Sequence, residues 1–99
     1  MEKKEYCVSL IDKINNREKE SLYKYFTRNT VIVFLDSFKE MIVPDFVNYV
    51  EENYFSKEIK IKRILESKVC VKLELDIEGK EVSFLIEVKE RRIKRLEIF

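Results

Sequence analysis

The feature that most constrains the fold is a pair of alternating segments in the C-terminal half of the chain. From Val69 to Ile77 every second residue is apolar, and the intervening residues are Cys70, Lys72, Glu74 and Asp76. Residues 82–88 repeat the alternation, and Gly79 between the segments can adopt the positive φ angle of a tight turn. Because alternate side chains of a strand point to opposite faces, this pattern predicts a β-hairpin with one buried face.

Two more strands flank this hairpin. Ile59 and Ile61 begin a strand before it, and residues 91–99 return as a final strand after it. In the final strand the apolar spacing slips between Ile93 and Leu96, which indicates a β-bulge. The C-terminal part of the chain is therefore predicted to form three or four antiparallel strands.

The N-terminal part of the chain has helical spacing instead. Apolar residues recur at steps of three and four from Tyr6 to Ile14, which predicts a first helix ending at Asn15-Asn16. Asn15 and Glu18 have the spacing of a capping box, so a second helix is expected to begin there and to end at Arg28-Asn29. The apolar face of that helix is Leu22, Tyr25 and Phe26.

A short hairpin and a third helix follow. Val31–Leu35 is rich in β-branched residues and predicts a strand, Asp36–Glu40 predicts a turn, and Met41–Val43 can pair back as a short strand. Pro44 suits the first turn of a helix. The buried face of this helix is predicted to be Phe46, Val47, Val50 and Tyr54.

The order of these elements predicts one α+β domain over residues 1–99. A chain of this length folds as a single domain, and its 45% apolar content suffices for a core. The N-terminal helices are expected to pack on one face of a curved, mostly antiparallel sheet.

The charge balance and the short apolar runs argue against nucleic acid and membranes as partners. Charged residues make up 39% of the chain but sum to +1, so no global field attracts nucleic acid. The one basic cluster, Glu90–Arg95, lacks an aromatic stacking platform, although a regulatory partner could use it. No apolar run is long enough to cross a membrane, and "MEKKEYC" lacks a signal-peptide core, so a cytoplasmic location is expected.

The composition also indicates the redox state of the cysteines and the kind of organism that the chain comes from. Cys7 and Cys70 lie far apart, which favours reduced thiols. Abundant Lys and Glu without Gln is typical of a thermophile, and equally of an AT-rich genome.

Residues for common catalytic and metal sites are missing. Without His, neither a Ser-His-Asp triad nor a Cys-His pair can form. Two isolated cysteines do not make a zinc site, and Glu51-Glu52 is more typical of a solvated helix face than of a magnesium site. No Gly-rich phosphate loop is present. We therefore predict no catalytic residues, no metal and no cofactor.

Four segments resemble the nuclear transport factor 2-like superfamily, and within it the SnoaL-like domains. They are "NNRE" (Asn15–Glu18), "YF" (Tyr25 and Phe26), "NTVIVF" (Asn29–Phe34) and the closing "RRIKRLEIF" (Arg91–Phe99), in this order. Arg91 stands where a turn Gly or Asp is usual. The resemblance covers nearly the whole chain and implies a cone in which helices and a concave sheet enclose a pocket.

The resemblance also implies where a catalytic member would carry its proton-handling groups. Isomerase-type members use an Asp base, a Tyr and a protonated Asp, and these positions fall near Phe34, Leu10 and Ile86 of this chain, all apolar. Asp36 lies just past the base position but has the setting of a turn residue.

These points lead to one expected function and one alternative. We expect a small non-catalytic domain that binds a small apolar ligand or a protein partner; the alternative is a cofactor-free isomerase, dehydratase or cyclase using Asp36 or a Tyr. The resemblance further implies a homodimer through the charged outer face of the sheet. The candidate pocket-lining residues are Tyr6, Leu10, Phe34, Asp36, Tyr49, Phe84 and Ile86.

Overall fold

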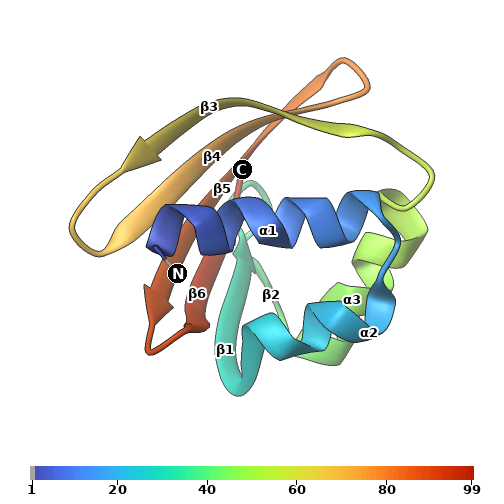
Figure 1. Cartoon of the computed structure of the whole chain (residues 1–99). Helices are drawn as coiled ribbons and strands as arrows, with labels where there is room; N and C mark the ends of the chain where they lie inside the picture. The colour runs from blue at the N-terminus through green and yellow to red at the C-terminus, as the bar shows by residue number, and fades with distance from the viewer. Residues whose placement is uncertain (1) are drawn as a thin grey trace.

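The computed structural model describes residues 2–99, which form helices on one side of a six-stranded sheet (Figure 1). The helical elements are α1 (Lys3–Asn15), α2 (Lys19–Leu22), the short 3-10 helix η1 (Tyr23–Tyr25) and α3 (Val43–Asn53). The strands are β1 (Phe26–Phe34), β2 (Lys39–Met41), β3 (Ile59–Glu66), β4 (Cys70–Ile77), β5 (Lys80–Lys89) and β6 (Arg92–Ile98). The predicted α+β class is confirmed.

The sheet is mostly antiparallel and curves around the helices. Its strand order is β2-β1-β6-β5-β4-β3, and only β1 and β6 run parallel. Helix α1 lies across the concave face, while α2 and α3 lie at one end of it (Figure 1). The arrangement is a two-layer cone, as the alternating strands and amphipathic helices require.

The predicted central hairpin forms as expected. Ile77 pairs with Lys80, and the two residues between them, Glu78 and Gly79, have φ angles of 51° and 91°. Two positive φ angles define the turn whose twist matches the flanking strands. The Asp76 carboxylate accepts a hydrogen bond of 2.7 Å from the Gly79 N–H and closes this turn.

The predicted bulge is also present. Glu87 pairs with Arg95 and Val88 pairs with Ile93, so Lys94 is the extra residue in β6. The bulge turns both Ile93 and Leu96 toward the core, where neither has exposed surface.

The second helix is shorter than its pattern predicts, and the predicted cap, Asn15, is wrong. It starts at Lys19, becomes 3-10 at Tyr23, and gives way to β1 at Phe26. Phe26 pairs with Ile93, because the buried Thr30 hydroxyl donates to the Ile93 carbonyl at 2.6 Å and holds this irregular stretch on β6. A tertiary hydrogen bond thus overrides the local helical pattern.

Three local boundaries also differ from the pattern. Asn15 ends α1 instead of capping α2. β2 covers residues 39–41 and not 41–43, because Val43 is the first residue of α3 and is buried there ahead of Pro44. Val69 precedes β4 and is 61% exposed, so the buried row of this strand begins at Val71.

Candidate functional site

The interior of the cone is filled by apolar side chains. Leu10 from α1 and Phe84 and Ile86 from β5 have no exposed surface. Phe34 and Tyr49 are half-buried and meet edge to face, with ring centroids 4.9 Å apart at 64°. Tyr54 at the end of α3 is buried beside them, and burial raises the pKa of its hydroxyl. Five of the seven candidate residues therefore form packed core or its edge.

Asp36 lies apart from these five. It is exposed in the turn that joins β1 and β2. Tyr6, by contrast, lines an open cleft.

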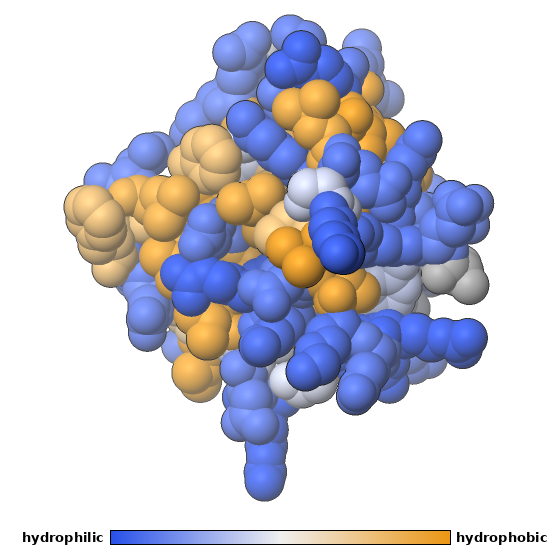
Figure 2. Space-filling model, turned by 90° about the vertical axis from the view of Figure 1, so that its left-hand side faces the viewer, coloured by the Kyte–Doolittle hydropathy of each residue, from blue (hydrophilic) through white to orange (hydrophobic). Residues whose placement is uncertain are grey.

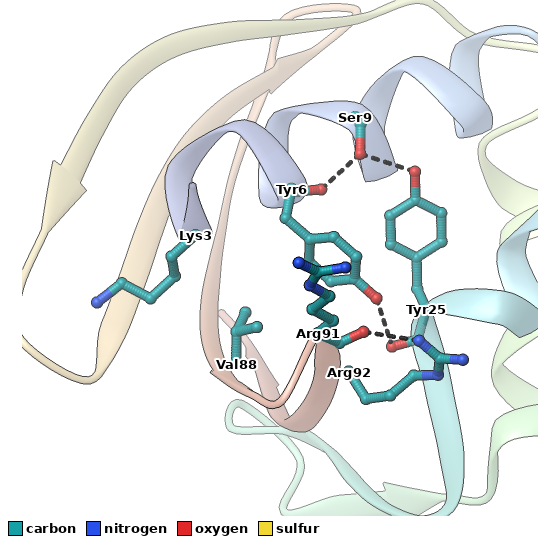
Figure 3. Close-up of a pocket in the computed structure, with 7 residues that line it drawn as sticks. All are labelled: Lys3, Tyr6, Ser9, Tyr25, Val88, Arg91 and Arg92. Atoms are coloured by element: carbon teal, nitrogen blue, oxygen red, sulfur yellow. Dashed lines mark hydrogen bonds between the residues drawn. The ribbon is translucent and has the colours of Figure 1, made fainter. Parts of the chain in front are cut away.

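That cleft, here called the tyrosine cleft, opens between α1 and the turn that joins β5 to β6 (Figure 3). Its volume of about 420 Å³ falls in the range of small-molecule sites. The lining residues are Lys3, Tyr6, Ser9, Tyr25, Val88, Arg91 and Arg92.

Two tyrosines and a serine form one wall. The rings of Tyr6 and Tyr25 lie 4.9 Å apart, tilted by 41°. The Ser9 hydroxyl donates to the Tyr6 carbonyl at 2.7 Å, so its contact of 2.7 Å with the Tyr25 hydroxyl has Tyr25 as the donor. The Tyr6 hydroxyl in turn donates to the Tyr25 carbonyl at 3.3 Å. These bonds hold both rings in place before any ligand arrives.

Burial shifts two ionisable groups at this wall toward their neutral forms. Burial raises the pKa of the Tyr6 hydroxyl, and the neighbouring Arg92 guanidinium opposes this rise only in part. Next to it, burial raises the pKa of the Cys7 thiol to about 12, against a smaller opposite influence of Lys3. Both groups are neutral at pH 7, so the Tyr6 hydroxyl can donate a hydrogen bond, and the Cys7 thiol has no exposed surface through which to meet a ligand.

The opposite side of the cleft is positively charged. Arg91 and Arg92 reach from the turn toward the tyrosines, whereas the Lys3 side chain extends away from them (Figure 3). The Lys3 ammonium donates to the carbonyls of Ser67 and Lys68, at 2.6 and 2.9 Å, and so ties α1 to the β3–β4 connection. Figure 2 shows this side of the molecule, where apolar patches appear between long hydrophilic side chains.

The sequence patterns alone do not identify most of this cleft. The pattern places Tyr25 on a helix face and Val88 in the buried row of residues 82–88, and Ser9 carries no signal of its own. Two signals are usable: Tyr6 is a candidate pocket residue, and the basic cluster at Glu90–Arg95 contains both arginines of the cleft. The cleft depends on α1 meeting the β5–β6 turn, and only the tertiary fold brings these distant segments together.

Residues 2–99 hold no cluster of metal-ligating side chains and no helix fit to cross a membrane. No three Cys, Asp or Glu side chains there gather closely enough to hold a metal ion. Within the same range, none of the helices has the length and apolarity needed to span a membrane.

Comparison with solved structures identifies the architecture. An NTF2-like (nuclear transport factor 2-like) protein of unknown function from Cytophaga hutchinsonii ATCC 33406 superposes with a TM-score of 0.74 at 18% identity, covering 95% of this chain and 85% of that one. A proposed SnoaL-like polyketide cyclase from Shewanella putrefaciens CN-32 gives a TM-score of 0.80 at 9% identity, covering 100% and 80%. The chain has the nuclear transport factor 2-like fold.

A third structure of this fold holds a small molecule. It is a protein with a ketosteroid isomerase-like fold from Catenulispora acidiphila DSM 44928, in complex with trimethylamine, with a TM-score of 0.75 at 11% identity over 96% of this chain and 84% of that one. No family model and no curated protein matches the chain. At these identities the nuclear transport factor 2-like fold is common to all, and function has to be argued from the residues.

Proposed function

We propose that this nuclear transport factor 2-like domain is a non-catalytic binding domain whose small, largely apolar ligand occupies the tyrosine cleft. The observation that carries the proposal is the contrast between a filled interior and an open cleft. Leu10, Phe84 and Ile86 have no exposed surface, whereas Tyr6 and Val88 line a cleft of about 420 Å³. A ligand can enter the cleft without any rearrangement of the core.

Two features of the cleft suit an apolar ligand. The Tyr6 ring is fixed by its contact with Tyr25, so ligand binding costs little side-chain entropy there. Val88 adds a branched apolar surface from β5, and it packs against the core. The trimethylamine complex of the Catenulispora protein supports the idea that domains of this fold accept small molecules.

The alternative, a cofactor-free isomerase, dehydratase or cyclase, finds less support. A general base must lie within reach of the substrate's proton. Asp36, the candidate base, is exposed in the β1–β2 turn and is not among the residues that line the tyrosine cleft.

Binding can be tested by titrating ¹⁵N-labelled protein with 2-naphthoate and with 2-naphthamide, two naphthalene probes of matched size. We expect amide shifts at Tyr6, Ser9 and Val88 with at least one of the probes. Val88→Thr keeps the side-chain shape but adds a hydroxyl, and is expected to weaken probe binding several-fold. Val82→Thr makes the same change near the other end of β5 and should leave binding unchanged. Absence of shifts at the cleft with both probes would contradict the proposal.

A further inference from the structure

The turn beside the tyrosine cleft has an unfavourable backbone. Lys89 pairs with Arg92, and the two residues between them, Glu90 and Arg91, have φ angles of 53° and 62°. Residues other than Gly, Asn and Asp rarely adopt this left-handed conformation, and Gly is the preferred second residue of such a turn. The β4–β5 turn follows that preference with Gly79 at φ 91°. Arg17, Phe38 and Glu78 also have positive φ angles, so the conformation alone assigns Arg91 no function, but it holds the Arg91 side chain at the edge of the tyrosine cleft.

The cations of the cleft are also left without acidic partners. Lys3, Arg91 and Arg92 take part in none of the ion pairs found among residues 2–99. No carboxylate is among the residues that line the cleft. Farther along β6, Arg95 pairs with Glu97 at 2.7 Å and Lys94 lies 3.9 Å from Glu87. On β6, Arg92 at the cleft end is thus the cation that lies outside these ion pairs.

Of the three cations, the two arginines are placed to act on a ligand. The Lys3 ammonium is already bound to two carbonyls of the β3–β4 connection. Arg92 donates a bond of 2.8 Å to the Arg91 carbonyl, and its guanidinium also lies beside the Tyr6 hydroxyl in the cleft. Both arginines are exposed, so they can turn toward a ligand without breaking an ion pair.

We propose that the ligand of the tyrosine cleft is a small organic acid, with an apolar body against Tyr6 and Val88 and a carboxylate bound by Arg91 and Arg92. This inference rests on the proposed binding function and adds the chemical class of the ligand. Arginine favours carboxylates because its planar fork presents paired N–H donors. The cleft volume of about 420 Å³ fits one small molecule and not a polymer.

The test compares 2-naphthoate with 2-naphthamide by calorimetric titration of the whole protein at low salt. The acid should bind about tenfold more tightly than the amide, the usual effect of a charge-assisted bond at an accessible site. The preference should shrink at higher salt. Arg92→Gln should reduce the preference, while Lys89→Gln removes a charge from the same hairpin outside the cleft and should preserve it.

Arg91→Gly separates binding from folding. Gly relieves the backbone strain at φ 62°, so this variant should melt at a higher temperature while losing part of the preference for the acid. Opposite changes in stability and affinity would support a ligand-binding role for Arg91.

Three results would contradict parts of the account. If acid and amide bind the cleft equally well, the organic-acid inference fails and the binding function stands. If the acid preference survives in both Arg91→Gly and Arg92→Gln, the inference fails as well. If neither probe binds the cleft, the inference and the proposed function fail together.

Discussion

At the scale of single residues, Asn15 joins two elements that are far apart in sequence. Its side-chain amide donates to the Ile59 carbonyl and accepts from the Ile59 N–H, both at 2.9 Å. The end of α1 is thereby fixed to the start of the edge strand β3. The capping-box pattern concealed this role, because an Asn side chain can satisfy a distant backbone as well as a nearby one.

Replacing Asn15 should therefore be costly. Asn15→Ala leaves both polar groups of Ile59 without their partner, and we expect a loss of about 2 kcal/mol in the free energy of unfolding, measured by urea denaturation. Asn16→Ala, at the exposed next position, should change it by less than about 0.5 kcal/mol. Equal effects of the two substitutions would show that the bonds to Ile59 contribute nothing.

Because of Cys7, the free energy of unfolding should fall as the pH rises in the alkaline range. Burial raises the pKa of its thiol from 9.0 to about 12 in the folded state, so the unfolded chain loses this proton first. The protonated Cys7 thiol contributes fully to the free energy of unfolding below pH 9. This contribution is lost as the pH rises toward 12, by at most about 1.4 kcal/mol per pH unit.

The pH dependence can be measured as the free energy of unfolding between pH 8 and pH 10. We expect Cys7→Ala to lower stability at pH 8 but to remove most of the decline above pH 9. Cys70→Ala alters the other, half-exposed thiol and should keep the decline. A decline of the same size in Cys7→Ala would contradict the assignment.

At the scale of elements, the β4–β5 and β5–β6 turns differ in sequence but share one geometry, with two positive φ angles each. Gly79 at φ 91° has open space around the position of a Cβ atom. Gly79→Ala should therefore lower stability by about 1 kcal/mol through backbone strain alone, as measured by thermal denaturation. An unchanged melting temperature would mean that the turn can shift to another type.

Elements stabilised by contacts between neighbouring residues could be predicted from the sequence, whereas elements fixed by distant contacts could not. The hairpin β4–β5 and the bulge at Lys94 were predicted because their signals are local, namely alternation, a turn glycine and a slipped register. The boundary between α2 and β1 was not, because the Thr30–Ile93 hydrogen bond that fixes it spans most of the chain. The same reason explains why Tyr6 was the one cleft residue among the candidates.

At the scale of the whole molecule, the outer face of the sheet is the surface through which two copies of the chain could pair, and its charged side chains form ion pairs. On this face Glu74 lies 3.1 Å from Arg63 and 3.6 Å from Lys72, and Arg95 lies 2.7 Å from Glu97. Charges that are paired within one chain offer little to a second copy. We propose that any homodimer through this face is weak and polar.

Sedimentation velocity over a range of protein concentrations tests this proposal. We expect association at high concentration that added salt reverses, since exposed ion pairs are screened. A monomer at all concentrations would contradict the homodimer, and a salt-resistant dimer would contradict the polar interface.

The interior of the cone is filled, and we propose that ligands bind at its edge instead. The most direct measurement is the set of ¹⁵N amide shifts caused by 2-naphthoate. We expect shifts at Tyr6, Ser9, Val88 and Arg92, around the tyrosine cleft. Shifts centred instead on Leu10, Phe84 and Ile86 would show that the interior opens to ligands, and would contradict the account.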